Sequence, residues 1–227
     1  MREEKRQATE QGPWLAASEP REVRAVALLL HGGQVTSTVP TGESGLAVRR
    51  MRPFAAALTR ARHDRGLAVW RLRNRVRGWN GAAQAPLHDA RWALAEVRRR
   101  HGSVPVVLIG HSLGGRVALR AAGDALVRGV VGLAPWLPEG EPTDQISGRH
   151  VVLAHGLWDL TTSPRATRAH AERIRPVAAS SSFVPVRFDL HAMVRLRTWN
   201  RLVVESVSAM LDERDRGEEG DERDGIR

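Results

Sequence analysis

Short apolar runs alternate with amphipathic runs along most of the chain, and this alternation constrains the fold more than any other feature. Each pair of runs takes about 35 residues, which is typical of parallel strands joined by right-handed helical crossovers. We therefore expect an α/β fold with a mostly parallel, doubly wound sheet of about six strands and helices on both faces. The sequence predicts strands at residues 23–30, 67–72, 104–109, 127–133, 151–154 and 183–189, and helices at residues 49–62, 86–100, 113–122, 164–175 and 199–211.

The two ends of the chain differ from the middle because they carry few apolar residues. Residues 1–20 lack periodicity and predict a loosely ordered segment, and the highly charged residues 212–227 predict a disordered tail. Residues 21–211 would form one domain with a single core. The short apolar runs and polar start predict no membrane span and no secretory leader, and the absence of cysteine favours a cytoplasmic protein.

The net charge of +10 comes almost wholly from arginine, since Lys5 is the only lysine. A basic chain can bind nucleic acid or anionic lipid. Here the arginines are scattered, and the chain has no tyrosine and only three phenylalanines with which to stack bases. We therefore favour a coding bias toward arginine as the cause, and expect neither a nucleic-acid nor a membrane partner.

A glycine-rich turn, Gly110-His111-Ser112-Leu113-Gly114, stands between a predicted strand and a predicted helix. In this context the pattern G-x-S-x-G indicates a nucleophilic serine lifted into the open by a sharp turn, with small flanking residues that avoid backbone collisions. The amide of Leu113 would lie at a helix N-terminus, where it can stabilise developing negative charge. The alternative is a glycine-rich turn with an incidental serine.

This turn, GHSLGG, resembles the nucleophile elbow of the α/β-hydrolase family, and the resemblance covers most of the chain. In that family, a His-Gly turn after an early strand supplies the second backbone N–H of the oxyanion hole. The resemblance implies Gly33 as this donor, with Gln34 as the second choice and with His31 and Gly32 as supporting residues. The alternative is an ordinary turn at the end of a strand.

The resemblance also implies the acid and the base of a triad. The segment HGLWD, followed by a proline that opens the next helix, matches the family's acid loop and points to Asp159. His191 follows the last predicted strand, so the chain order is Ser112, Asp159, His191, as this fold requires. Asp159 would hold one tautomer of the histidine, although it could also be a helix cap or a loop acid. We expect His111 and His155 to support the site.

Other side chains near predicted strand ends are candidates for substrate binding. The arginines after the second predicted strand can hold a carboxylate or phosphate, although we favour ion pairs with Asp89 or Glu96, or exposure to solvent. Two tryptophans could line an acyl pocket or merely cover the core. The candidates are Gln34, Arg75, Arg77, Trp136 and Trp158, and Arg71 and Arg73 precede these arginines on alternate positions.

Only residues 136–149 separate the fourth predicted strand from the fifth, which is too short for a helical cap. The chain thus resembles compact, lidless serine esterases and dienelactone-hydrolase-like members of the family, although dienelactone hydrolases use cysteine where this chain has Ser112. We expect hydrolysis of small-molecule carboxylic esters or thioesters without cofactor or metal. The alternatives are acyl transfer, cofactor-free perhydrolase or haloperoxidase chemistry, and a binding protein without catalysis. The sequence does not indicate the oligomeric state.

Overall fold

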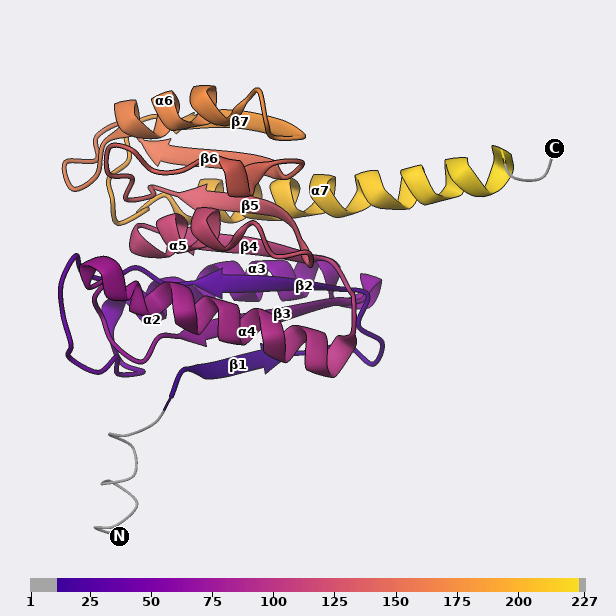
Figure 1. Cartoon of the computed structure of the whole chain (residues 1–227), viewed down its shortest axis with the longest axis horizontal. Coiled ribbons are helices and arrows are strands. Elements are labelled where there is room, and N and C mark those ends of the chain that lie inside the picture. The colour runs from indigo at the N-terminus through magenta and orange to yellow at the C-terminus, as the bar shows by residue number, and fades with distance from the viewer. Residues whose placement is uncertain (1–11, 225–227) are drawn as a thin grey trace, which may run out of the picture.

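A seven-stranded sheet forms the centre of the computed structural model, which describes residues 12–224, with side chains for residues 12–212 (Figure 1). The strand order is β1-β3-β2-β4-β5-β6-β7, and every neighbouring pair is parallel except β1 with β3. The predicted α/β class and parallel sheet are therefore confirmed. The strands are β1 (Trp14–Ser18), β2 (Ala25–Leu30), β3 (Leu67–Arg73), β4 (Val106–His111), β5 (Val127–Leu133), β6 (His150–Gly156) and β7 (Ser180–Val186).

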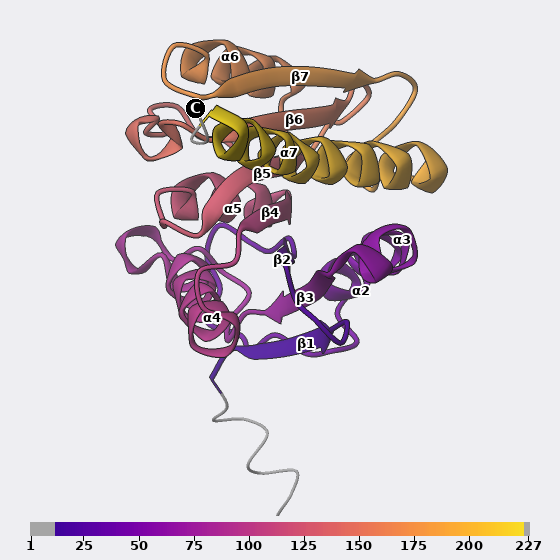
Figure 2. The ribbon, with the colours of Figure 1, turned by 90° about the vertical axis from the view of Figure 1, so that its right-hand side faces the viewer.

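Helices cover both faces of the sheet (Figure 2), as the sequence predicts. None of the helices in the described part of the chain is long and apolar enough to cross a membrane. One face carries α2 (Leu46–Arg50), α3 (Arg52–Arg62) and α7 (Leu196–Asp224), and the other carries α4 (Ala85–His101), α5 (Leu113–Ala121) and α6 (Pro164–Ile174). Three short 3-10 turns are η1 (His63–Arg65), η2 (Gly81–Ala83) and η3 (Asp144–Ile146).

The strands are apolar on both sides because each side meets a helical layer. In β2, Leu28 packs into the core beneath α4 and α5, while the next residue, Leu29, packs into the core beneath α3 and α7. Both side chains are fully buried. A parallel sheet covered in this way places all its carboxyl strand ends along one edge, where sites in open α/β sheets form.

Several elements differ in extent from the predicted ones, and two of these differences change the local structure. The helix predicted over residues 49–62 is two helices, α2 and α3, because Pro53 lacks the N–H that would bond to the carbonyl of Arg49. Strand β7 begins and ends three residues before the predicted run at 183–189, and the residues that follow it form a loop. The link from β5 to β6 holds only the turn η3 and no cap, as predicted.

The ends of the chain are more regular than the sequence predicts. Residues 14–18, inside the segment expected to be loose, form edge strand β1, whose backbone pairs with β3. Helix α7 continues to Asp224, although disorder is expected over 212–227. A helix already anchored by its packed half needs no new nucleus to extend. Residues 1–11 and 225–227 lie outside the described residues, and the division into three regions stays a prediction.

Candidate active site

Ser112 occupies the sharp turn between β4 and α5 with a strained backbone, at φ 54° and ψ −118°. This left-handed conformation is costly for a residue with a side chain and persists only where the surroundings enforce it. The Ser112 amide donates to the carbonyl of Leu133 (3.0 Å), and its carbonyl accepts from the amides of Gly115 and Trp136 (3.0 Å each). The turn is therefore held from β5 as well as from its own helix.

The two glycines of the motif are required by close backbone approaches. A Cβ on Gly110 would collide with the carbonyl of Gly114, and a Cβ on Gly114 would collide with the carbonyl of Leu30 in β2. Neither backbone can move without disturbing the sheet. The spacing of G-x-S-x-G thus follows from sterics at both positions.

The loop after β2 packs against the start of α5. A Cβ on Gly33 would lie only 2.5 Å from Cδ2 of Leu113 and would also strike the carbonyl of Arg77. The amide of Gln34 donates to that same carbonyl (2.8 Å) and is therefore occupied. Within the described residues no backbone acceptor takes the amide of Gly33. This arrangement favours Gly33 over Gln34 as the partner of the Leu113 amide in an oxyanion hole.

His31 braces this loop from beneath. Its Nδ1 donates to the carbonyl of Gly32 (2.6 Å), and its Nε2 accepts from the amide of Asn74 (3.1 Å). Burial lowers the pKa of His31, so the ring stays neutral and keeps this tautomer. Both ring nitrogens are therefore engaged in fixing the loop.

Asp159 and His191 meet at the carboxyl ends of β6 and β7. His191 Nδ1 donates to Asp159 Oδ2 over 2.7 Å, and the carboxylate is fully buried while the imidazole is partly exposed. An aspartate so placed selects the histidine tautomer whose Nε2 is free to accept a proton. The bond joins the two residues that the resemblance implied as acid and base.

Asp159 accepts more hydrogen bonds than a triad alone requires. Its Oδ1 accepts from the amides of Thr161 (2.7 Å) and Thr162 (3.0 Å), and its Oδ2 accepts from the Thr162 hydroxyl (2.8 Å). Burial raises the pKa of the Asp159 carboxyl, but these bonds and that from His191 outweigh it and lower the pKa to about 2. The carboxylate therefore stays ionised at neutral pH.

His155 and Thr162 belong to this centre, and sequence reasoning did not assign them contacts with the acid. His155 Nε2 lies 3.0 Å from Asp159 Oδ2, and its Nδ1 lies 2.8 Å from the hydroxyl of Thr167. The Thr162 hydroxyl also lies 3.1 Å from His191 Nδ1. The sequence signal was the pair of threonines two and three residues after the aspartate, the spacing at which amides bond back to its carboxylate.

Asp189 organises the loop that carries His191, and sequence reasoning placed it at the end of a strand instead. Its buried carboxylate accepts from the amides of Val194 (3.0 Å) and Arg195 (3.1 Å) and from Nε1 of Trp199 (2.7 Å). The side chain thus ties both ends of the loop to helix α7. His191 is positioned by this loop rather than by a strand.

His111 connects the loop of His191 to the elbow of Ser112. Its Nε2 donates to the carbonyl of His191 over 3.0 Å, and the two rings lie with centroids 4.8 Å apart. Burial, and then the neighbouring His191, lower the pKa of His111 to about 3. A neutral ring beside the elbow therefore anchors the backbone of the candidate base.

Known proteins carry the same architecture. A sequence model of the family described as alpha/beta hydrolase fold matches residues 53–216, which is more than half of the chain. The chain belongs to the α/β-hydrolase family. Comparison with curated proteins finds no match.

Solved structures of other α/β hydrolases superpose on this one at low sequence identity. An α/β serine hydrolase homologue from Coxiella burnetii is 17% identical, with 86% of this chain and 93% of that chain covered and a TM-score of 0.65. A lidless α/β serine hydrolase from Xanthomonas campestris is 19% identical (87% and 88% covered, TM-score 0.63). An esterase from Thermogutta terrifontis, solved with butyrate, is 17% identical (88% and 89% covered, TM-score 0.66). At these identities the likeness concerns the fold alone.

The remaining predicted residues occupy different places in this hydrolase fold. Arg75 binds the buried carboxylate of Asp89 through Nε (2.7 Å) and through its amide (2.8 Å), so its guanidinium is already paired. The side chain of Arg77 is exposed. Half-buried Trp136 stacks on the guanidinium of Arg116 (4.6 Å), and the rim of the site holds exposed Trp158.

Exposed apolar side chains gather on the loops that follow the parallel strands of the hydrolase sheet. Monomeric proteins rarely leave large apolar side chains together in solvent unless the surface binds something. These loops share one edge of the sheet with Ser112, and we call their exposed apolar side chains the apolar rim. The rim residues are Val35, Val39, Leu157, Trp158, Leu160, Phe188, Leu190 and Val194, which are 44–98% exposed.

Proposed function

We propose that this protein hydrolyses carboxylic esters or thioesters through an acyl intermediate on Ser112. The observation that carries the proposal is the 2.7 Å bond between Asp159 and His191, on a loop anchored to the strained elbow of Ser112 through His111. The nucleophile, base, acid and backbone donors that acyl transfer needs come from loops at the same sheet edge.

The chemistry divides into two balanced steps. Ser112 Oγ attacks the acyl carbon while His191 Nε2 takes the hydroxyl proton, and the amides of Gly33 and Leu113 stabilise the oxyanion. Collapse expels the alcohol or thiol, which receives the proton from His191. Water then attacks the acyl-enzyme with His191 again as the base, which releases the acid and restores the Ser112 hydroxyl.

The ionised Asp159 stabilises the imidazolium that forms in both steps. Among the described residues no hydrogen bond joins the Ser112 hydroxyl to His191. Such bonds often align only when substrate is bound, so this geometry is compatible with the proposed role. Ordering of the rim loops around an acyl group would complete the alignment.

The proposed substrate class is a small molecule with an apolar acyl group. The absence of a cap between β5 and β6 leaves the site open, and the exposed apolar rim supplies a surface for the acyl chain. The esterase from Thermogutta terrifontis was solved with butyrate, and this butyrate is an example of such a ligand on the same fold. A cytoplasmic location and the absence of nucleic-acid and membrane partners stay predictions.

A substrate series tests the proposal. We expect turnover of p-nitrophenyl esters and acyl thioesters, measured from acetyl to dodecanoyl, with a maximum kcat/KM at one chain length. Ser112→Ala removes turnover, whereas Ser103→Ala, a substitution on the exposed turn before β4, leaves it unchanged. Adding an alcohol or peroxide separates hydrolysis from acyl transfer and perhydrolysis. No turnover of any member of the series would contradict the proposal.

A further inference from the structure

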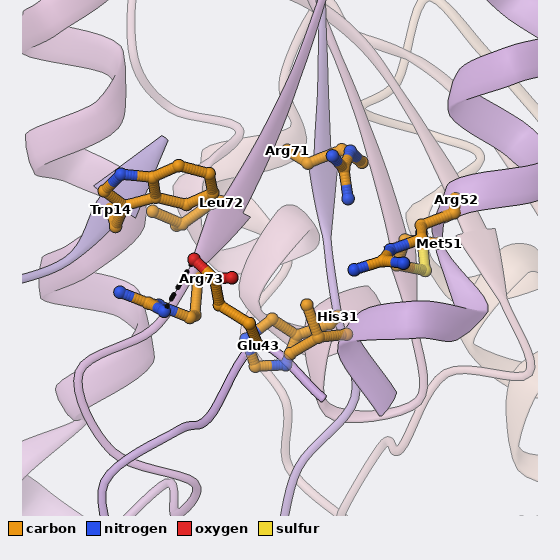
Figure 3. Close-up of a pocket in the computed structure, with 9 residues that line it drawn as sticks. Trp14, His31, Glu43, Met51, Arg52, Arg71, Leu72 and Arg73 are labelled. Atoms are coloured by element: carbon orange, nitrogen blue, oxygen red, sulfur yellow. Dashed lines mark ion pairs between the residues drawn. The ribbon is translucent and has the colours of Figure 1, made fainter. Parts of the chain in front are cut away.

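A pocket lies between edge strand β1, strand β3 and the start of helix α3 (Figure 3). Its volume is about 190 Å³, and its walls include Trp14 and Leu72 as well as three arginines. A shallower hollow of about 380 Å³ adjoins it and shares Arg52 and Arg71. These two arginines therefore stand where both hollows meet.

The charges in this pocket do not balance. Arg73 pairs with Glu43 over 3.2 Å and lies 5.2 Å from the ring centroid of Trp14. Arg52 and Arg71 form no ion pair or side-chain hydrogen bond with any residue between 12 and 212. Figure 3 shows their guanidinium groups reaching into the same space from α3 and β3. Two positive charges therefore converge, and the acid that lines the pocket, Glu43, is paired with Arg73 rather than with either of them.

The position of Arg71 makes this imbalance costly. Alternate residues of β3 share one face of the sheet, and the earlier ones on this face, Leu67 and Val69, are buried beneath α3. Arg71 takes the next place in that row, and its side chain is half-buried. Burial, and then the charge of Arg52, lower the pKa of Arg71. An anion bound beside Arg71 would compensate this charge.

We propose that this pocket binds a small oxyanion, a carboxylate or phosphate on a short apolar stem, through the guanidinium groups of Arg52 and Arg71. A guanidinium is a planar fork of donors that matches both kinds of anion. The pocket has the volume of about six water molecules, which suits a small anion. Trp14, Met51 and Leu72 supply apolar walls for the stem. The proposal does not rest on the acyl chemistry proposed at Ser112, and His31, which braces the Gly33 loop, also lines this pocket.

Glu43 sets the affinity of the pocket. Its carboxylate is largely exposed, holds Arg73 and adds a negative charge beside the place where the anion binds. Replacing it by a neutral amide of the same shape removes the repulsion and frees a third guanidinium. Glu43→Gln therefore strengthens anion binding, which no purely structural role of the arginines explains.

Calorimetric titration of the full-length protein tests the proposal. Inorganic phosphate, acetate and hexanoate are titrated at low ionic strength, with chloride as the control for general charge screening. We expect Arg52→Gln and Arg71→Gln each to weaken binding about tenfold, because each removes a charge-assisted hydrogen bond. Arg60→Gln, a substitution of an exposed arginine on the same helix, leaves binding unchanged. Glu43→Gln strengthens binding about threefold or more.

The anions distinguish the two sources of the ligand. Tighter binding of phosphate identifies a phosphate ester, and tighter binding of hexanoate than of acetate identifies a carboxylate on an apolar stem. The proposal would be overturned if the anions bound with equal affinity to the native protein and to both variants, Arg52→Gln and Arg71→Gln. Unchanged or weaker binding in Glu43→Gln would also overturn it, and this variant alters only an exposed loop, so its folding is not at risk.

Discussion

The Asp159–His191 centre follows strands β6 and β7, and the Arg52–Arg71 pocket lies beside β3 on the other side of the sheet, yet the two regions treat charge in opposite ways. Asp159 is buried, and each of its oxygens accepts hydrogen bonds from surrounding loops. Arg71 is half-buried and Arg52 is exposed, and neither arginine forms an ion pair with a described residue, because the acid of their pocket, Glu43, is paired with Arg73. The fold itself supplies the hydrogen-bond partners of Asp159, whereas the guanidinium groups of Arg52 and Arg71 keep donors that no described residue accepts from.

This contrast distinguishes a preorganised catalytic acid from a site that waits for a charged ligand. A catalytic acid has to keep its charge and position through the reaction, so the fold supplies its partners in advance. A binding site for a charged ligand has to leave its partners unpaired until the ligand arrives, at a cost in stability. The predictions below alter one region at a time and ask whether the consequences differ as this view requires.

Removing the charge of Asp159 in the Asp159–His191 centre has the largest expected effect, which is on kcat. Asp159→Asn keeps the shape but selects the wrong histidine tautomer, so we expect kcat for the best ester to fall about 10⁴-fold. Asp64→Asn, which changes an exposed acid on η1, serves as the control. The measurement is steady-state turnover, and a change of less than tenfold would contradict the role of Asp159.

The loop of His191 tests whether preorganisation extends beyond the reacting groups. Asp189→Asn turns an amide toward the N–H groups of Arg195 and Trp199, where the native carboxylate accepts. We expect the free energy of unfolding to fall by about 3 kcal/mol. Misplacement of His191 lowers kcat about 10²-fold. Denaturant unfolding and turnover measure the two effects, with Asp144→Asn as the control. Normal turnover in a folded Asp189→Asn protein would refute this positioning role.

The stability of the protein should be sensitive to acid because buried neutral histidines lie near the Asp159–His191 centre. His111 has a pKa of about 3 when folded, against 6.5 for an ordinary histidine, so unfolding takes up a proton between these values. Stability therefore falls as the pH drops from 6.5 toward 3, by about 1.4 kcal/mol per pH unit for this residue. His111→Gln removes this slope in chemical denaturation, whereas His88→Gln, at an exposed position, keeps it. Equal slopes in both variants would contradict the burial argument.

A substitution in the Arg52–Arg71 pocket has the smallest expected effect, and it raises the free energy of unfolding instead of lowering it. Arg71→Gln relieves repulsion by Arg52, so without any anion we expect the free energy of unfolding to rise by about 0.5 kcal/mol. Phosphate raises the Tm of the native protein more than that of the variant. The measurement is thermal unfolding in chloride and in phosphate. Destabilisation of the variant in chloride would indicate that Arg71 has a structural role instead.

The sequence was sufficient to predict those parts of the molecule that depend on local sterics and patterning. The apolar runs predict six of the seven strands, and Gly110 and Gly114 predict a tight turn at Ser112, because each is a matter of neighbouring residues. Strand β1 was not predicted, since an edge strand takes its bonds from β3 and needs little apolar pattern of its own.

The less predictable parts depend on contacts between distant segments. The five donors around Asp159 come from β6, from the following turn and from the loop after β7, so no single stretch of sequence contains them. The unpaired state of Arg52 and Arg71 can be seen only when α3 and β3 are brought together. Of the arginines after the second predicted strand, the expected pairing with Asp89 is found at Arg75.

Covalent labelling of Ser112 tests the central claim most directly. The protein is treated with a fluorophosphonate, and intact mass and peptide mapping then locate the adduct. We expect one adduct per chain, on Ser112, present in Ser103→Ala and absent in Ser112→Ala. An unlabelled native protein, or equal labelling of Ser112→Ala, would contradict the assignment of Ser112 as the nucleophile.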